Sequence, residues 1–349
     1  MKEQFGITAK GETAYKYTLT NTSGCRLVVS DFGALLLELH VPDRQGTFAD
    51  VVLGYDNLAD YEKNPESIGA TVGRHANRIQ GASFTLHGKT YELAHNDHNN
   101  NLHSNPNSYF KRMWQTEDVE DTELGQSITF TLFSPDGDQG FPGNVHVAVT
   151  YTLTEENEVM IHYEAETDED TIVNLTNHSY FNLAGHDGPS IENHIAWINA
   201  SFYTVADSES IPTGEISPVE GTPMDFRVPK PVGQDINSDF VQLQYGSGYD
   251  HNWVLDNHGE MGLVASLYDA VSGRKMEVYT DLPGMQFYAG NFLNNVAGKG
   301  GVIYGKRTGM CYETQYFPDA IHHPNFPSPV LKAGEKYDTT TVYKFGAEE

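Results

Sequence analysis

The sequence has few cysteines, few basic residues and no long hydrophobic run. Its 349 residues include only Cys25 and Cys311, too few for a disulfide framework or a thiolate metal cluster. Only 21 lysines and arginines accompany 48 aspartates and glutamates, so the formal net charge is −27. A surface this acidic repels phosphate backbones and anionic lipids. The composition therefore argues against partners such as nucleic acid or a membrane surface.

Several sorting and catalytic motifs are also missing. The first residues, MKEQFGITAKGET, contain no apolar core of a signal peptide, and no stretch is long and apolar enough for a transmembrane helix. We therefore expect a cytoplasmic protein. HExxH, GxSxG, phosphate-binding loop and GxGxxG motifs do not occur, which argues against the enzyme classes that they mark.

Alternation of apolar and polar residues with a period of two dominates the chain, and Gly, Pro and Asp separate the alternating stretches. The clearest series predicts strands at 127–133, 144–154 and 158–167, with a loop at 134–143 and a turn at 155–157. A short helix is predicted near 55–64. No βαβ rhythm and no linker appear, so the fold class we predict is all-β: one large antiparallel β-sandwich, with residues 1–349 as a single domain.

The segment TIVNLTNHSYFNL, residues 171–183, carries the first candidate site. Read as one strand, it places on one face the side chains of Ile172, Asn174, Thr176, His178, Tyr180 and Asn182. A face that is polar, uncharged and aromatic suits a neutral polyhydroxylated ligand. His178 is therefore a candidate functional residue, and a structural hydrogen-bonded histidine is the alternative.

A second candidate is the carboxylate of GMCYETQYF, where Cys311, Glu313 and Gln315 share one strand face. Burial among aromatic, uncharged neighbours raises a carboxyl pKa toward the range of a general base. The alternative is an exposed glutamate at a sheet edge. Cys311 is better explained as a small buried residue than as a nucleophile.

Two further segments offer sugar-binding side chains. In GRHANRIQG, Asn77 and Arg78 lead into a strand, and Arg78 either binds a sugar oxygen or pairs with a structural carboxylate. In GSGYDHNWVLD, Asp250 lies beside aromatic residues in a turn, a composition typical of carbohydrate sites, although a turn-forming aspartate is equally compatible.

A metal site receives little support from the sequence. HNDHNNNLH contains His95, His98 and His103, but their spacing matches no strong zinc pattern and asparagine fills most of the gaps. We predict no metal and no cofactor.

Taken together, these segments resemble the aldose 1-epimerase (galactose mutarotase) family along nearly the whole chain. The motifs occur in family order: FGALLLELHVPDRQGTFADVVLGYDNLADY, GRHANRI, NLH, SPDGDQGFPG, VNLTNHSYFNL, IPTGEISPVEGTPMDFR, GYDHNW, PGMQFYAGN and CYETQYFPDAIHHPNFPSP. The resemblance implies a large β-sandwich and an enzyme that interconverts the α and β anomers of free aldoses such as glucose and galactose, without metal or cofactor. Monomer and homodimer are both compatible with it.

The resemblance also implies roles for single residues. His178 matches the general acid that protonates the ring oxygen, and Glu313 matches the base that removes the C1 hydroxyl proton. Both are expected to have pKa values near neutrality, so that each can act in either direction. The matching substrate-binding residues are Asn77, Arg78, His103, Asp250 and Gln286, with Arg78 and His103 near the ring oxygen.

The chain departs from the family pattern at two places, and other functions remain possible. Ser104 and Asn105 replace the two glycines that usually follow the histidine of the LH motif, and His75 replaces an aliphatic or aromatic residue. Loss of glycine restricts the turn, which puts the preferred sugar in doubt. The alternatives are a non-catalytic sugar-binding protein and an epimerase for a pentose or disaccharide. Two other classes are disfavoured. The motifs contain no basic cluster that could bind a sugar phosphate, and a glycosidase would need a second catalytic carboxylate.

Overall fold

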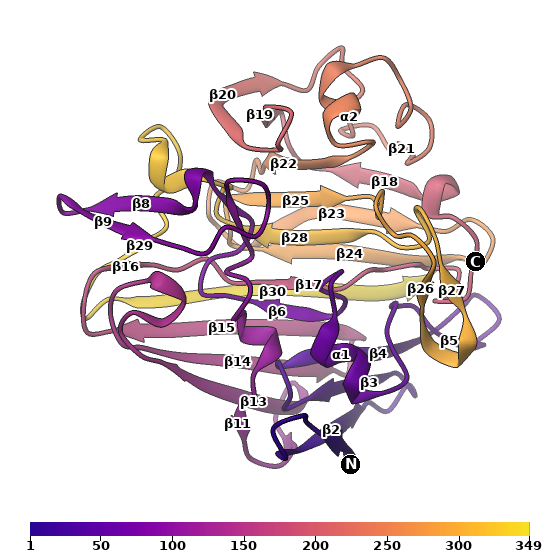
Figure 1. Cartoon of the computed structure of the whole chain (residues 1–349). Coiled ribbons are helices and arrows are strands. Elements are labelled where there is room, and N and C mark those ends of the chain that lie inside the picture. Colours follow the sequence, from indigo (N-terminus) through magenta and orange to yellow (C-terminus); the bar gives the residue numbers. More distant parts are fainter. Residues whose placement is uncertain (349) are drawn as a thin grey trace.

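The computed structural model describes residues 1–348, and its main elements are antiparallel strands in two layers (Figure 1). The first layer is a ten-stranded sheet. Its strands are β11 (Gln115–Thr116), β12 (Glu120–Asp121), β13 (Gly125–Ser134), β14 (Val145–Thr154), β15 (Glu158–Thr167), β30 (Lys336–Ala347), β24 (Arg274–Thr280), β23 (Gly262–Tyr268), β18 (Ile195–Ile198) and β21 (Lys230–Pro231). The predicted β-sandwich is confirmed.

The second layer combines two five-stranded sheets with a two-stranded pair between them. One sheet contains β1 (Lys2–Ile7), β2 (Thr13–Thr20), β3 (Arg26–Ser30), β4 (Leu35–Pro42) and β5 (Phe48–Asp50). The other contains β28 (Cys311–Gln315), β25 (Gly284–Tyr288), β22 (Asp250–Val254), β19 (Phe202–Ala206) and β20 (Pro212–Pro218). The pair is β6 (Ala70–Val72) with β17 (Thr176–His178). Backbone hydrogen bonds join the three parts, among them Leu36 N to Gly69 O and the two bonds that Phe181 and Met310 exchange.

Short hairpins and helices complete the chain. The remaining strand pairs are β7 (Arg78–Ile79) with β10 (Asn101–Leu102), β8 (Ser83–Leu86) with β9 (Lys89–Glu92), β16 (Thr171–Ile172) with β29 (Val330–Leu331), and β26 (Val296–Ala297) with β27 (Ile303–Tyr304). The helices are α1 (Leu58–Lys63) and α2 (Val241–Tyr245). Asn57 caps α1 by accepting a hydrogen bond from Asp60 N, and the predicted short helix is confirmed. Among the described residues, no helix has the length and apolar composition needed to cross a membrane.

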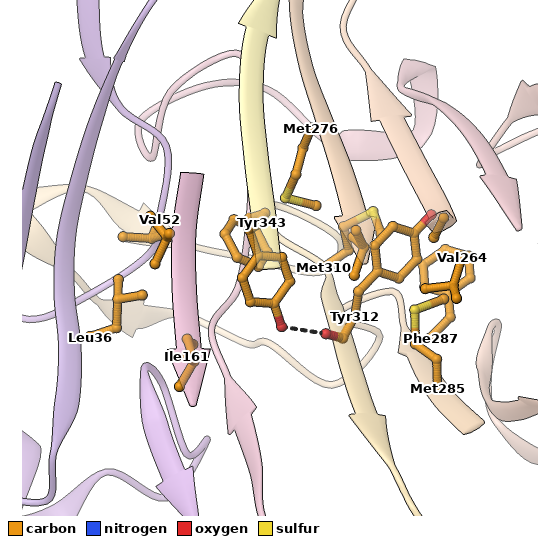
Figure 2. Packing of buried hydrophobic residues seen from close by; sticks show 14 of the residues in the cluster. Leu36, Val52, Ile161, Val264, Met276, Met285, Phe287, Met310, Tyr312 and Tyr343 are labelled. Atoms are coloured by element: carbon orange, nitrogen blue, oxygen red, sulfur yellow. Dashed lines mark hydrogen bonds between the residues drawn. The ribbon is translucent and has the colours of Figure 1, made fainter. Parts of the chain in front are cut away.

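The core fills the space between the two layers, and strand periodicity determines what points into it. Figure 2 shows Tyr343 of β30 donating its hydroxyl hydrogen to the backbone oxygen of Tyr312 on β28, at 2.8 Å. Phe287 and Met285 of β25 pack in the same cluster. Because neighbouring residues of a strand face opposite ways, the residues between these core positions point away from the large sheet. That outward face of β22, β25 and β28 carries the site.

Candidate active site

All seven side chains that the sequence predicts for the site line one cleft of about 250 Å³. They are Asn77, Arg78, His103, His178, Asp250, Gln286 and Glu313. This volume lies below the roughly 300–1,000 Å³ of sites for drug-sized ligands, so it suits a small molecule such as a monosaccharide. The residues come from six separate segments, and the fold brings them together.

Strand register explains how two of them, Gln286 and Glu313, meet. On β22, β25 and β28 the paired positions are Asn252 with Gln286, and Gln286 with Glu313. The alternate positions Phe287 and Tyr312 belong to the core cluster. One sheet face thus presents the Glu313 carboxylate and the Gln286 carboxamide to the cleft, while the other face stays apolar.

His178 ends β17 and lies directly beside Glu313. Its Nε2 is 3.6 Å from Glu313 Oε1, and its Nδ1 is 3.5 Å from the sulfur of Cys311. The rings of His103 and Tyr180 pack against it, with centroids 5.3 Å and 5.1 Å away. Burial lowers the pKa of His178 to about 4, because a charged imidazolium loses its hydration there.

Glu313 is buried at the bottom of the same cleft. Burial raises the pKa of its carboxyl group well above the usual value, and the negative charge of Asp250 adds to the rise, whereas Arg78 opposes it. The sequence-based prediction of pKa values near neutrality is therefore wrong for His178. The reason is that this histidine is enclosed by aromatic rings and a thiol instead of water.

His103 and Arg78 also line the cleft. Asn77 N donates to Nδ1 of His103 at 3.0 Å, so the neutral ring carries its proton on Nε2. Burial lowers the pKa of His103 well below the usual value and keeps the ring neutral. Arg78 Nε donates to Asp97 at 2.7 Å. Arg78 thus lines the cleft and also has the structural carboxylate partner that the sequence left open.

The prediction of one continuous strand at 171–183 is wrong. The structure has β16 and β17 there, with bends between and after them, and residues 171–183 are all buried. His178 and Tyr180 reach the cleft, but Asn174 and Asn182 do not line it. Their carboxamides bond backbone groups instead, Asn174 with Tyr316 and Asn182 with Pro189 and Thr308. Buried irregular backbone needs such partners, which explains this density of polar residues.

The sequence analysis missed several cleft residues. Tyr288, Phe292, Glu66 and Asn96 line the cleft as well. Tyr288 lies two residues after Gln286, so a period-two reading of β25 could have found it. Glu66 precedes β6 in a loop, and Asn96 lies between β9 and β10, so no local pattern marked them.

Three residues of the cleft lie close enough together to hold a metal ion. Ligand atoms of His103, His178 and Glu313 lie within 4.8 Å of one another. Two imidazoles and one carboxylate are typical of metal sites as well as of acid–base pairs. His95 and His98 of the same histidine-rich segment as His103 are exposed and do not line the cleft.

A wider hollow of about 670 Å³ lies on the outer face of β13, β14 and β15. Phe133, His146 and Glu164 are among its lining residues. Its polar side chains stand on an open sheet face, and the cleft around Glu313 is the site with buried, converging polar groups.

Comparison with known proteins agrees with this geometry. The family model described as aldose 1-epimerase matches residues 15–344. The chain belongs to the aldose 1-epimerase family. It is 42% identical over 340 residues to the galactose mutarotase of Homo sapiens, covering 97% of this chain and 96% of that protein. It is 35% identical over 351 residues to the aldose 1-epimerase of Escherichia coli, covering 100% of each. The crystal structure of galactose 1-epimerase from Lactobacillus acidophilus superimposes with a TM-score of 0.88 at 27% identity, covering 100% of this chain and 99% of that one.

The two departures from the aldose 1-epimerase pattern contact each other. Ser104 has a φ of 52°, the left-handed region that glycine favours, so this backbone conformation persists without glycine. Its hydroxyl accepts from His75 N at 3.0 Å and donates to His75 O at 2.9 Å. Asn105 lines the cleft, where a glycine would leave space. The replacements therefore change the wall of the cleft next to His103.

Proposed function

We propose that the chain is an aldose 1-epimerase in which His178 and Glu313 exchange protons with a neutral aldose. The observation that supports this most strongly is the 3.6 Å approach of His178 Nε2 to Glu313 Oε1 inside a cleft lined by hydroxyl-binding groups. Opening a pyranose needs one proton added to the ring oxygen and one removed from the C1 hydroxyl. Two adjacent groups that share one proton can supply both.

His178 and Glu313 return to their starting protonation states after a full turnover. Opening starts from protonated His178 and ionised Glu313; the ring oxygen takes the imidazolium proton as the C1 hydroxyl gives its proton to the carboxylate. The products are the open-chain aldehyde, neutral His178 and protonated Glu313. Rotation about the C1–C2 bond exposes the other carbonyl face. Closure then reverses both transfers and restores the starting pair.

The directions of the two pKa shifts bear on this cycle. A lowered pKa at His178 and a raised pKa at Glu313 favour the neutral pair, which is the state from which the ring closes. A bound sugar stabilises the ionised carboxylate by donating its C1 hydroxyl to it. Substrate binding therefore helps move the proton from Glu313 to His178 before the ring opens.

The other cleft residues hold the sugar in this proposal. The Nε2–H of His103 and the guanidinium of Arg78 stabilise negative charge that develops at the ring oxygen. Asp250, Gln286 and Asn77 bind hydroxyl groups. Glu66, Asp97 and Asp250 make the surroundings acidic, so a neutral sugar is favoured over a sugar phosphate. A cytoplasmic location and a monomeric or homodimeric state are further predictions, and light scattering tests the latter.

Polarimetry of freshly dissolved α-D-glucose and α-D-galactose tests the proposal. Wild-type protein should speed the approach to the anomeric equilibrium, and it should do so equally with a chelator present. Glu313→Gln and His178→Asn should each lower the rate by roughly 10²–10⁴-fold. Glu166→Gln and His162→Asn on the outer face of the large sheet are matched controls and should keep full activity.

One other result would contradict the proposal, and a second would change the sugar that it names. If neither sugar is turned over but either raises the melting temperature, the chain is a sugar-binding protein. If neither sugar has any effect, the changed wall at Asn105 has altered the specificity, and pentoses and reducing disaccharides are the next substrates to measure.

A further inference from the structure

Four hydrogen bonds run in one direction beneath the cleft and connect its two sides. Arg78 N donates to Asn77 Oδ1 at 2.9 Å, and Asn77 Nδ2 donates to Gln315 Oε1 at 3.4 Å. Gln315 Nε2 donates to Gln286 Oε1 at 3.4 Å, and Gln286 Nε2 donates to Asp250 Oδ1 at 2.7 Å. We call this series the amide relay. Its central member, Gln315, is fully buried and does not line the cleft.

The two ends of the amide relay determine how every carboxamide in it must be oriented. A backbone N–H can only donate, and an ionised carboxylate can only accept. Between these ends, each carboxamide has one orientation that gives every bond a donor and an acceptor. Rotating Gln315 by 180° would place nitrogen against the Asn77 nitrogen and oxygen against the Gln286 oxygen. The same Nε2 also donates to Asn252 Oδ1 at 3.2 Å, which supports the observed orientation.

We propose that Gln315 is a positioning residue for the sugar-binding side chains. It is the side chain through which the relay passes from Asn77 on one side of the cleft to Gln286 and Asp250 on the other. Through these bonds it keeps the Gln286 amide group donating to Asp250 and so fixes both groups for hydroxyl binding. Hydrogen bonds in series polarise one another, which makes the orientation of the whole series cooperative. The inference rests on the proposed function, because the role concerns sugar binding in that cleft.

Loss of Gln315 should weaken binding more than it slows proton transfer. None of its side-chain hydrogen bonds involves His178 or Glu313. Gln315→Met keeps the approximate shape and removes both polar atoms. We expect the KM for galactose to rise about three- to tenfold, the effect of losing a buried hydrogen bond, while kcat changes less than twofold.

Gln315→Glu gives a readout that a merely structural role would not. A protonated carboxyl group can accept from Asn77 and donate to Gln286, as the amide does. An ionised one can only accept, and it places negative charge against Gln286 Oε1. The KM of Gln315→Glu should therefore be close to wild type at low pH and rise as the introduced carboxyl ionises. Gln315→Met should show no such change beyond the pH dependence of the wild type.

Gln242→Met is the matched control. Gln242 is also buried, and its amide bonds both backbone groups of Ala206 outside the cleft. Its loss should lower the melting temperature and leave KM unchanged. The inference fails if Gln315→Met and Gln242→Met have the same KM, or if Gln315→Glu follows the wild-type pH dependence. Galactose affinity by calorimetry is measured alongside, so the relay is judged on Kd even if the wild type proves inactive as an epimerase.

Discussion

His178 Nε2 lies 3.6 Å from Glu313 Oε1, and the two side chains are only 7% and 2% exposed. Two ionisable groups this close titrate as a pair, and their apparent pKa values belong to the pair. Burial acts on both in the same sense: it disfavours the imidazolium and it disfavours the carboxylate. This relationship makes the pH dependence of activity the most direct probe of the site.

The rate should depend on pH as a bell-shaped curve, because the pair must carry one proton. Its alkaline limb follows loss of the proton held by Glu313. Burial is the main cause of the raised pKa of Glu313, and Asp250 adds to it while Arg78 opposes it. Asp250→Asn should therefore move the alkaline limb of kcat/KM to lower pH, and Arg78→Met should move it to higher pH. Both variants will also be slower, so the midpoint of the limb is compared and not its height. Midpoints that move in the same direction would contradict the assignment.

Glu313 should make the fold less stable at high pH. The pKa of Glu313 is higher in the folded protein than in the unfolded chain, where it is about 4.5. The stabilising contribution of protonated Glu313 is therefore complete below pH 4.5, and it is lost as the pH rises through the folded-state pKa. Glu313→Gln removes this loss. The melting temperature of the variant minus that of the wild type should increase between pH 5 and pH 9. Glu166→Gln, whose carboxyl is exposed, should give a constant difference. A constant difference for Glu313→Gln too would show that the carboxyl is not shielded from water.

The strands were predictable because their side chains alternate on a sheet with one buried face. The loop at 134–143 and the strands that flank it appear where the sequence placed them. The segment at 171–183 was not predictable in the same way. Its asparagines bond backbone groups of distant loops, and no local pattern reveals such partners.

The same distinction between local and distant contacts separates what was predictable in the site from what was not. The seven predicted site residues were found from motifs that the chain shares with its family. Their adjacency was not, because β17 and β28 are separated by more than 130 residues and meet only in the fold. The proposed role of Gln315 depends on hydrogen bonds to side chains in other strands and loops. The sequence could therefore say only that Gln315 shares a strand face with Glu313.

His75 should make the protein labile to acid. It is completely buried, neither ring nitrogen has a hydrogen-bond partner, and burial lowers its pKa to about 4. The unfolded chain, with a pKa of about 6.5, takes up the proton first, so stability falls as pH drops from 6.5 toward 4. At pH 5 the cost from this residue is about 2 kcal/mol, at ~1.4 kcal/mol per pKa unit. His75→Met should lose less stability than wild type between pH 7 and pH 5 in urea unfolding. His258→Gln, at an exposed position, should behave like wild type, and an equal loss in His75→Met would refute the prediction.

Arg74 should hold the segment that carries Asn77 and Arg78. Its side chain is completely buried and donates to Ser134 O at the end of β13, at 3.1 Å, and to Pro142 O in the loop that follows, at 2.6 Å. Arg74→Met leaves these carbonyl oxygens buried without donors, which should cost roughly 3 kcal/mol or more of unfolding free energy. Because the segment then loses its anchor, kcat/KM should also fall.

The matched change Arg227→Met removes an exposed arginine whose pairing with Asp225 is screened by water. Its stability and kcat/KM should stay close to wild type. Urea unfolding and polarimetry on the same preparations measure both quantities. Equal stability of the two variants would mean that water replaces the guanidinium at Pro142 and Ser134. A fall in stability without a fall in kcat/KM would mean that β7 and β10 suffice to place Asn77 and Arg78.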